Sequence, residues 1–131
     1  MSRLRTIARG RRFAEAQMTE RCRIERAEGT PVRAPDGELR PPMVLVWEGK
    51  CRLRTVSSVT SDVEAASQLL VTQTAVLFLP VDGTGEVRVN DVVTFTAASA
   101  DAALATVQVR VAGLHFDSDA TARRLPVEMV S

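Results

Sequence analysis

The sequence predicts a mainly β fold: a small antiparallel β-barrel of six or seven strands, with an N-terminal α-helix and long loops. Short segments rich in Val, Thr, Leu and Phe recur along the chain, separated by turns that contain Gly, Pro, Asn or Asp. Several of these segments alternate apolar and polar residues, which is typical of a strand with one buried face. A small sandwich fits the same pattern, but a barrel would also remove the exposed sheet edges.

Length and composition fit one domain. The chain has 131 residues, of which 45% are hydrophobic, enough to bury one core. We expect a basic helix or arm over residues 1–20 and a barrel domain over 21–131, with long loops at 27–42 and 55–68. No apolar run approaches the roughly 20 residues of a spanning helix, and none follows the basic N-terminus as in a signal peptide. We therefore expect no membrane association.

Charge is balanced overall but unevenly distributed. The formal net charge is +1. Residues 1–26 carry eight arginines against three glutamates, a balance of +5, whereas residues 56–91 carry five acidic residues against one arginine, a balance of −4. Such polarity can orient a subunit on a charged partner; solvated surfaces of a globular protein are an equally good interpretation.

The first expected element is a helix over residues 3–18, in which Leu4, Ile7 and Ala8 share one face. Gly10 weakens this helix by up to ~1 kcal/mol relative to alanine and could kink it. Because an isolated helix of this length is marginal in water, it should fold only against a neighbour.

A half-buried strand is expected next, at Cys22–Arg26, followed by a surface loop or loose hairpin at 27–42. Two strands at 43–47 and 51–56 should follow, separated by a turn or bulge at Glu48-Gly49. The only tryptophan, Trp47, is expected in the core or in a subunit contact. The polar segment at 55–68 is interpreted either as a loop or as a loop with a short helix at 62–68, and as a candidate contact-forming segment.

The longest strand is expected at Leu70–Leu79, where Pro80 ends it. A loop at 82–85, a short strand around Val87–Val89, a turn at Asn90-Asp91 and a strand over 92–97 complete this central stretch.

The C-terminal third should begin with a loop or helical turn at 99–103 and a strand at 104–112. A last strand is expected at 122–130, which Pro126 either places at a sheet edge or interrupts. Asp117 and Asp119 could form ion pairs with Arg123-Arg124.

The residues that usually carry chemistry are few. Cys22 and Cys51 are expected as buried thiols rather than a disulfide, and the lone His115 as a structural residue. No nucleophile, base and orienting residue converge in the sequence, and no metal-ligand spacing is present. We therefore expect no catalytic residues, no metal, no cofactor and no enzyme activity.

The order of elements resembles a known family. Three segments carry the resemblance: VWEGKCRLR, which contains Trp47, VRVNDVV at Val87–Val93, and TARRLPVE at Thr121–Glu128. Over nearly the whole chain it is similar to the head-closure, or stopper, proteins among the small head–tail connectors of long-tailed phages, as found in actinobacterial phages and prophages. Asn90-Asp91 stands where Gly-Asp is more usual.

The resemblance implies a structural virion protein of the phage neck, assembled in the cytoplasm of the host bacterium. Its copies would form a homo-oligomeric ring, commonly dodecameric, between the portal and adaptor proteins and the tail terminator or tail tube. A loop would face the channel and retain packaged double-stranded DNA; the candidate residues are Val59, Thr60, Ser61, Asp62, Val63 and Glu64, with 27–42 as an alternative. Candidate partner or subunit contacts are Arg3, Arg5, Arg9, Arg11, Arg12 and Trp47.

Two alternatives stay open at this stage. An adaptor or a tail-completion or terminator protein of the same neck would share the small β fold and ring symmetry. A small β-barrel nucleic-acid-binding protein would use the arginines of the N-terminal arm on phosphates, although aromatic residues make up only 4% of the chain and give little support for base stacking.

Overall fold

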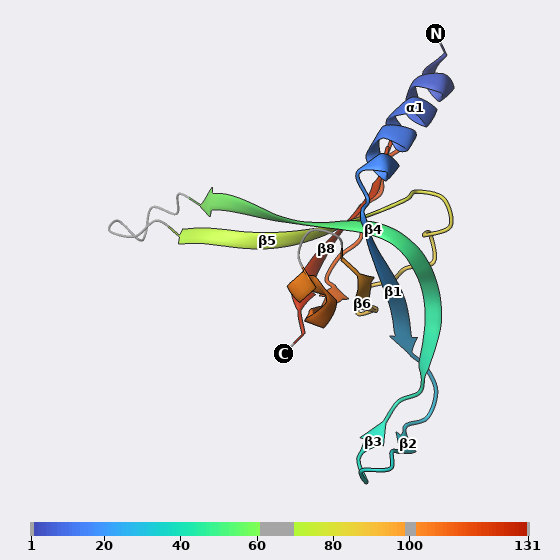
Figure 1. Cartoon of the computed structure of the whole chain (residues 1–131), viewed down its shortest axis with the longest axis vertical. Helices are drawn as coiled ribbons and strands as arrows, with labels where there is room; N and C mark the ends of the chain where they lie inside the picture. Colours follow the sequence, from blue (N-terminus) through green and yellow to red (C-terminus); the bar gives the residue numbers. More distant parts are fainter. Residues whose placement is uncertain (1, 61–69, 99–101, 131) are drawn as a thin grey trace.

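Six antiparallel strands close into a barrel, which confirms the predicted fold class. The structure is a computed structural model that describes residues 2–60, 70–98 and 102–130, with the backbone alone for 56–60 and 70–74. Its elements are α1 (Arg3–Ala16), β1 (Glu20–Ala27), β2 (Val32–Arg33), β3 (Leu39–Arg40), β4 (Met43–Thr60), β5 (Leu70–Leu79), β6 (Val92–Ala97), the 3₁₀ helix η2 (Ala102–Thr106), β7 (Gln108–Val111) and β8 (Arg123–Met129). Around the barrel the strand order is β1–β4–β5–β8–β7–β6, and β6 pairs with β1 to close it (Figure 1).

The hydrophobic core fills the barrel. Alternate residues of the strands point inward, as the period-two pattern predicts, and they meet around Phe95 and Ile24. The buried set is Cys22, Ile24, Cys51, Leu77, Leu79, Val87, Val93, Phe95, Val109, Val111, Leu125 and Val127. Both cysteines are therefore buried free thiols, as expected.

Strand β4 runs unbroken from Met43 to Thr60, so the expected interruption at Glu48-Gly49 is wrong. A β-bulge lies slightly earlier, because Ile24 pairs with Trp47 and Glu25 with Leu45, which leaves Val46 as the extra residue. Gly49 is explained by packing: a Cβ atom there would lie 2.6 Å from the Trp47 ring, so glycine provides the space for that ring.

The far half of β4 corrects the expected loop at 55–68. Residues 55–60 continue the strand and pair with 70–75 of β5. The small polar residues of this segment suggested a loop, but several are β-branched and suit an antiparallel ladder. The short helix expected at 62–68 lies outside the described residues. At 27–42 the loose-hairpin interpretation is confirmed, because β2 and β3 pair there as a separate two-stranded sheet.

Between β5 and β6 the chain makes turns instead of the expected strand around Val87–Val89. The turn at Asn90-Asp91 is confirmed, and Asn90 has a positive φ of 78°, which short polar side chains tolerate. The Asp91 carboxylate accepts a hydrogen bond from the Arg88 backbone N–H at 2.8 Å. This local bond holds the backbone in a turn and so prevents the strand.

Strand β7 is shorter than expected, because residues 102–106 form η2. The Thr106 hydroxyl donates to the Ala103 carbonyl at 2.7 Å, and the Val107 N–H donates to the Leu104 carbonyl at 3.0 Å. A side-chain bond of this kind competes with the β-ladder and explains why the alternation at 104–107 does not give a strand.

Strand β8 lies inside the sheet, between β5 and β7, and runs unbroken through Pro126, so neither the edge position nor the interruption expected from this proline is correct. The Pro126 carbonyl accepts the Ala112 N–H at 2.8 Å, on the β7 side. Because N and C=O of one residue point to the same side of a strand, the missing N–H also faces β7, beyond the last paired residue, Val111. Proline therefore interrupts no bond to β5.

Candidate assembly surfaces

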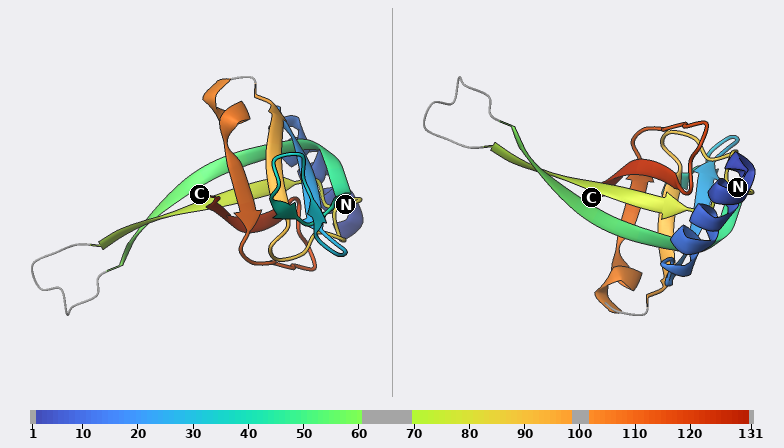
Figure 2. Two further views of the ribbon diagram at one scale, coloured as in Figure 1. Left: turned by 90° about the horizontal axis from the view of Figure 1, so that it is seen from below. Right: turned by 90° about the horizontal axis from the view of Figure 1, so that it is seen from above.

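Three elements project from the barrel (Figures 1 and 2). Helix α1 extends from one end, and the β2–β3 arm (residues 28–45) extends from the other end. The β4–β5 ribbon, formed by the outer halves of these two strands, leaves the barrel sideways. Such projections offer a large surface for contacts with other molecules and add little to the barrel core.

Helix α1 begins at Ser2, whose hydroxyl accepts the Arg5 backbone N–H at 3.2 Å as an N-cap. It ends at Ala16, near the expected boundary. The helix runs straight through Gly10, where a Cβ atom would lie 2.6 Å from the Thr121 methyl group. Gly10 thus allows the close approach of the segment at 117–122. No residue of the helix is fully buried, and the half-buried ones are Ile7, Ala8, Gly10, Arg11, Ala14 and Glu15.

The five predicted arginines of α1 divide into two groups. Arg3 forms an ion pair with Asp119, while Arg11 lies 3.9 Å from Asp82 and donates to the Ala120 carbonyl at 3.2 Å. Arginines 5, 9 and 12 follow the spacing of one helix face, opposite the face on the 117–122 segment. Within the described part of the chain these three make no ion pair, so they are the free part of the predicted contact set.

Asp119 corrects the predicted pairing of this segment with Arg123-Arg124. Its partner is Arg3, 116 residues away in the sequence. Arg123 instead donates to the Thr84 hydroxyl at 2.8 Å and the Val81 carbonyl at 3.1 Å, and its guanidinium lies 5.5 Å from the centre of the Phe116 ring. It fixes the turn after β5 to the barrel.

Trp47, predicted for the core or for a subunit contact, packs against the core from a half-buried position on β4. Its ring covers Gly49, and its indole nitrogen lies 3.6 Å from the position a Cβ atom would take on Gly83. This packing agrees with the core interpretation, and a subunit contact at Trp47 stays a prediction. The indole also joins β4 to the 82–85 turn.

Two buried polar residues in the described structure, Thr84 and Asp91, were missed by sequence reasoning. Arg26 donates to both carboxylate oxygens of Asp91, at 2.8 and 2.9 Å, and to the Glu86 carbonyl at 2.7 Å. The hydrogen bond to Asp91 raises the pKa of the Arg26 guanidinium. This bidentate pair ties β1 to the turn before β6. No local motif signals it, because its partners lie 65 residues apart.

The β2–β3 arm carries exposed apolar side chains that the sequence did not single out. Their residue types are typical of a core, yet each is about half exposed or more; the set is Val32, Leu39, Met43, Val44 and Leu45. Val32 and Leu39 lie on the hairpin itself, whereas residues 43–45 begin β4 and pair with residues 25–27 of β1. Exposed apolar side chains at one end of a molecule are typical of a contact with another chain. The Pro- and Gly-rich composition suggested a solvated loop and so concealed this surface.

The predicted channel residues are only partly described. Val59 and Thr60 lie at the outer end of β4, where their backbones pair with Val71 and Leu70. Residues 61–64 lie outside the described residues. The outer end of the β4–β5 ribbon, which includes Val59 and Thr60, lies away from the barrel (Figure 2).

The remaining candidates for chemistry are distributed over the surface. His115 is exposed on the segment after β7. Within residues 2–60, 70–98 and 102–130, no three His, Cys, Asp or Glu side chains lie close enough together to hold a metal ion. No helix in the described part is long and apolar enough to cross a membrane.

Fold and projections define the class: a small closed β-barrel that carries a helix, a short hairpin arm and a long ribbon outside its core. The chain belongs to a family of unknown function (DUF6093), which it matches over residues 10–128. The match spans the second half of α1 and nearly all of the barrel. No curated protein matches the chain.

Proposed function

We propose that this protein is a non-enzymatic structural component of a phage neck, a head-to-tail connector of the stopper or head-closure type. Its copies form a ring, dodecameric as the resemblance implies, between the portal or adaptor and the tail terminator or tail tube. The ring helps to retain packaged DNA and offers the attachment surface for the tail. In this proposal the chain assembles in the bacterial cytoplasm and ends in the virion.

One observation carries the proposal: the barrel is complete without α1 and the β2–β3 arm. The helix buries no residue, and the arm exposes five apolar side chains. A projecting helix or hairpin gains most of its stability from packing, so partners outside the chain would add to the few contacts that these elements make within it. Ring neighbours on either side supply such partners. An adaptor or tail-completion role in the same neck uses the same surfaces.

The test is cryo-electron microscopy of intact virions of the phage or prophage that encodes the chain, focused on the neck. We expect a ring of these barrels between portal and tail. A neck whose rings are all accounted for by other chains would overturn the connector role.

Within the ring, we assign the β4–β5 ribbon to the channel. Deleting Val59–Glu64 removes the end of the ribbon and leaves the barrel strands in place, so folding should be unchanged. Heads assembled with the deletion protein should lose packaged DNA. The readout is the DNA content of purified particles, with circular dichroism as the folding control, and full retention of DNA would contradict this assignment.

A second candidate function rests on the free arginines of α1. Residues 5, 9 and 12 line one exposed helix face and could bind successive phosphates of duplex DNA. A salt-dependent mobility shift that disappears when all three are changed to glutamate would support a nucleic-acid-binding barrel. Matched changes at the paired residues Arg3 and Arg11 serve as the control.

A further inference from the structure

A basic groove lies on the outer face of the barrel beside α1. Pairing across β4, β5 and β8 aligns Arg52 with Phe78 and Phe78 with Arg124, and Arg54 lies two residues further along the same face of β4. The Arg124 guanidinium lies 5.9 Å from the centre of the Phe78 ring. Phe13 of α1 forms the opposite wall, and the groove has a volume of about 200 Å³.

The groove is positively charged and open. None of its lining residues is acidic, and the three arginines make no ion pair in the described part of the chain. Arg52 is held by a hydrogen bond of 2.5 Å to the Gln17 side chain, which fixes its guanidinium at the C-terminal end of α1. A preordered cluster of guanidinium groups beside aromatic rings suits a partner that carries carboxylates and apolar groups together.

The opposite end of the molecule carries such a combination. Its acidic part is three glutamates, Glu25, Glu28 and Glu86, which we call the glutamate cluster. None of these glutamates makes an ion pair with a described residue. Arg26 lies close to Glu28 and Glu86, which both contribute to its raised pKa, but its guanidinium forms its ion pair with Asp91. Exposed apolar side chains adjoin the glutamate cluster, since Leu45 pairs with Glu25 across the ladder and Met43 pairs with Ala27 next to Glu28.

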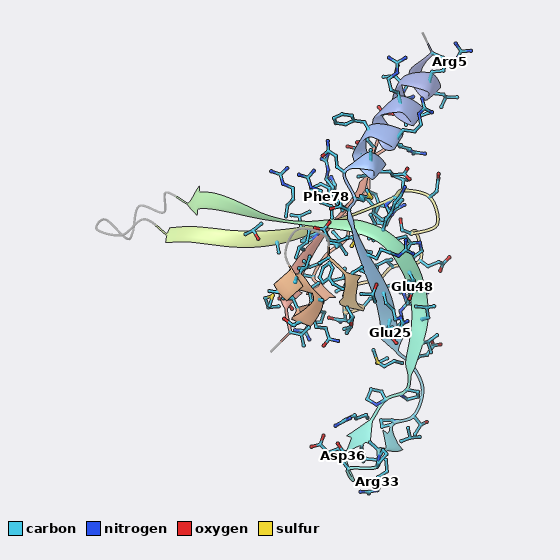
Figure 3. The ribbon with its side chains drawn as sticks, in the orientation of Figure 1. Arg5, Glu25, Arg33, Asp36, Glu48 and Phe78 are labelled. Atoms are coloured by element: carbon cyan, nitrogen blue, oxygen red, sulfur yellow. The ribbon has the colours of Figure 1, made fainter. Side chains whose placement is uncertain are left out.

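We infer that the basic groove of one copy binds the glutamate cluster and the adjoining apolar residues of a second copy. The two surfaces lie toward opposite ends of the folded molecule, with Phe78 near α1 and Glu25 toward the β2–β3 arm (Figure 3). A chain therefore does not fill its own groove, and copies associate head to tail. Such a contact repeats from copy to copy, and it gives a ring when the rotation between neighbouring copies closes. The inference rests on the proposed ring and names its subunit contact.

Duplex DNA is the competing occupant. A phosphate backbone would satisfy the arginines but offers no apolar surface to Phe13 and Phe78, whereas Met43 and Leu45 do. The chemistry of the groove therefore favours the second copy.

The test uses the full-length chain and three double variants, with sedimentation velocity at low salt as the measurement. The groove variant is Arg54→Glu with Arg124→Glu, and the cluster variant, in which the glutamate cluster is reversed, is Glu28→Arg with Glu86→Arg. The matched control, Arg21→Glu with Arg110→Glu, makes the same charge change outside the groove. Urea unfolding checks that each variant folds.

The unmodified and control chains should associate with rising concentration. The groove variant and the cluster variant should each associate roughly 100-fold more weakly, because like charges then face each other. Mixed in equal amounts, these two variants should associate again, because the unchanged groove meets the unchanged glutamate cluster and the reversed groove meets the reversed cluster. A chain with all four changes should regain association.

Three results would overturn the inference: a monomeric unmodified chain at all concentrations, association of the groove variant at full strength, or a groove variant that loses only binding to duplex DNA. None of these results bears on whether the chain is present in the neck. Conversely, absence from the neck would leave the head-to-tail association intact, so failure of this inference is distinguishable from failure of the proposed function.

Discussion

Leucines in the barrel and leucines in the projections are in opposite environments. Leu77 and Leu125 are fully buried, whereas Leu4 on α1 and Leu39 on the β2–β3 arm are 77% and 63% exposed. Ion pairs differ in the same way, since the Asp91 side chain is almost fully buried against Arg26 and the Arg3–Asp119 pair is exposed. The barrel thus holds the buried core, whereas the projections expose apolar side chains to solvent.

The largest effect is expected from a core leucine. Leu77→Ala should lower the free energy of unfolding by about 3 kcal/mol, because it removes buried methyl groups and leaves a cavity in the barrel. Urea unfolding followed by circular dichroism measures the change. Leu39→Ala on the arm is the matched control, with an expected change within about 0.5 kcal/mol. Equal losses at both positions would mean that the arm is packed as tightly as the core.

The buried ion pair sharpens the comparison for polar contacts. Asp91→Asn should cost about 3 kcal/mol, because it removes the buried charge that pairs with Arg26 and holds the Arg88 N–H. Glu128→Gln makes the same chemical change in the exposed pair with Arg110 and should cost less than about 1 kcal/mol. Urea unfolding of both variants decides; similar costs would contradict a structural role for the Asp91 turn.

The sequence was sufficient for the barrel because its information is local. Alternation at Val109 and Val111 and at Leu125 and Val127 identified the inward positions, and the uninterrupted run at 70–79 identified β5. Errors arose where a distant partner decides the local structure. Gly49 suggested a turn, but its small size serves the Trp47 ring, and Pro126 suggested an edge.

For the candidate site, the sequence identified charges without their partners. Arginine clustering indicated a contact surface on α1, but which arginines are free depends on the segment at 117–122, more than 100 positions away. The basic groove depends on the register of three strands, which places Arg52, Phe78 and Arg124 side by side. No pattern within one segment encodes that alignment.

A smaller effect is expected from the paired thiols inside the barrel. The hydrogen bond that the Cys51 thiol donates to Cys22, together with burial, raises the pKa of Cys51. The native state then keeps a proton that the unfolded chain, with an ordinary thiol pKa near 8.5, loses. Above about pH 8.5 the unfolded state binds fewer protons, so the free energy of unfolding should fall with rising pH, by up to about 1.4 kcal/mol per pH unit.

Urea unfolding between about pH 8 and pH 10 measures this slope. Cys51→Ala removes the thiol and should flatten the slope, whatever it does to stability at neutral pH. An unchanged slope in that variant would show that other groups cause the alkaline loss.

The smallest effect tests whether α1 rests on the barrel in the free chain. Gly10→Ala adds a Cβ atom that would meet the Thr121 methyl group at 2.6 Å, so its gain in helix propensity, up to ~1 kcal/mol, should be cancelled. Thr121→Ser removes that methyl group and should restore the gain. A double-mutant cycle measured by urea unfolding should therefore give a coupling of about 0.5–1 kcal/mol. Helix docking predicts this coupling, whereas a helix that is free of the barrel gains helicity from alanine regardless of residue 121. Zero coupling would mean that α1 does not rest on the barrel in the free chain and docks only on a partner. The contrast between barrel and projections would then include α1.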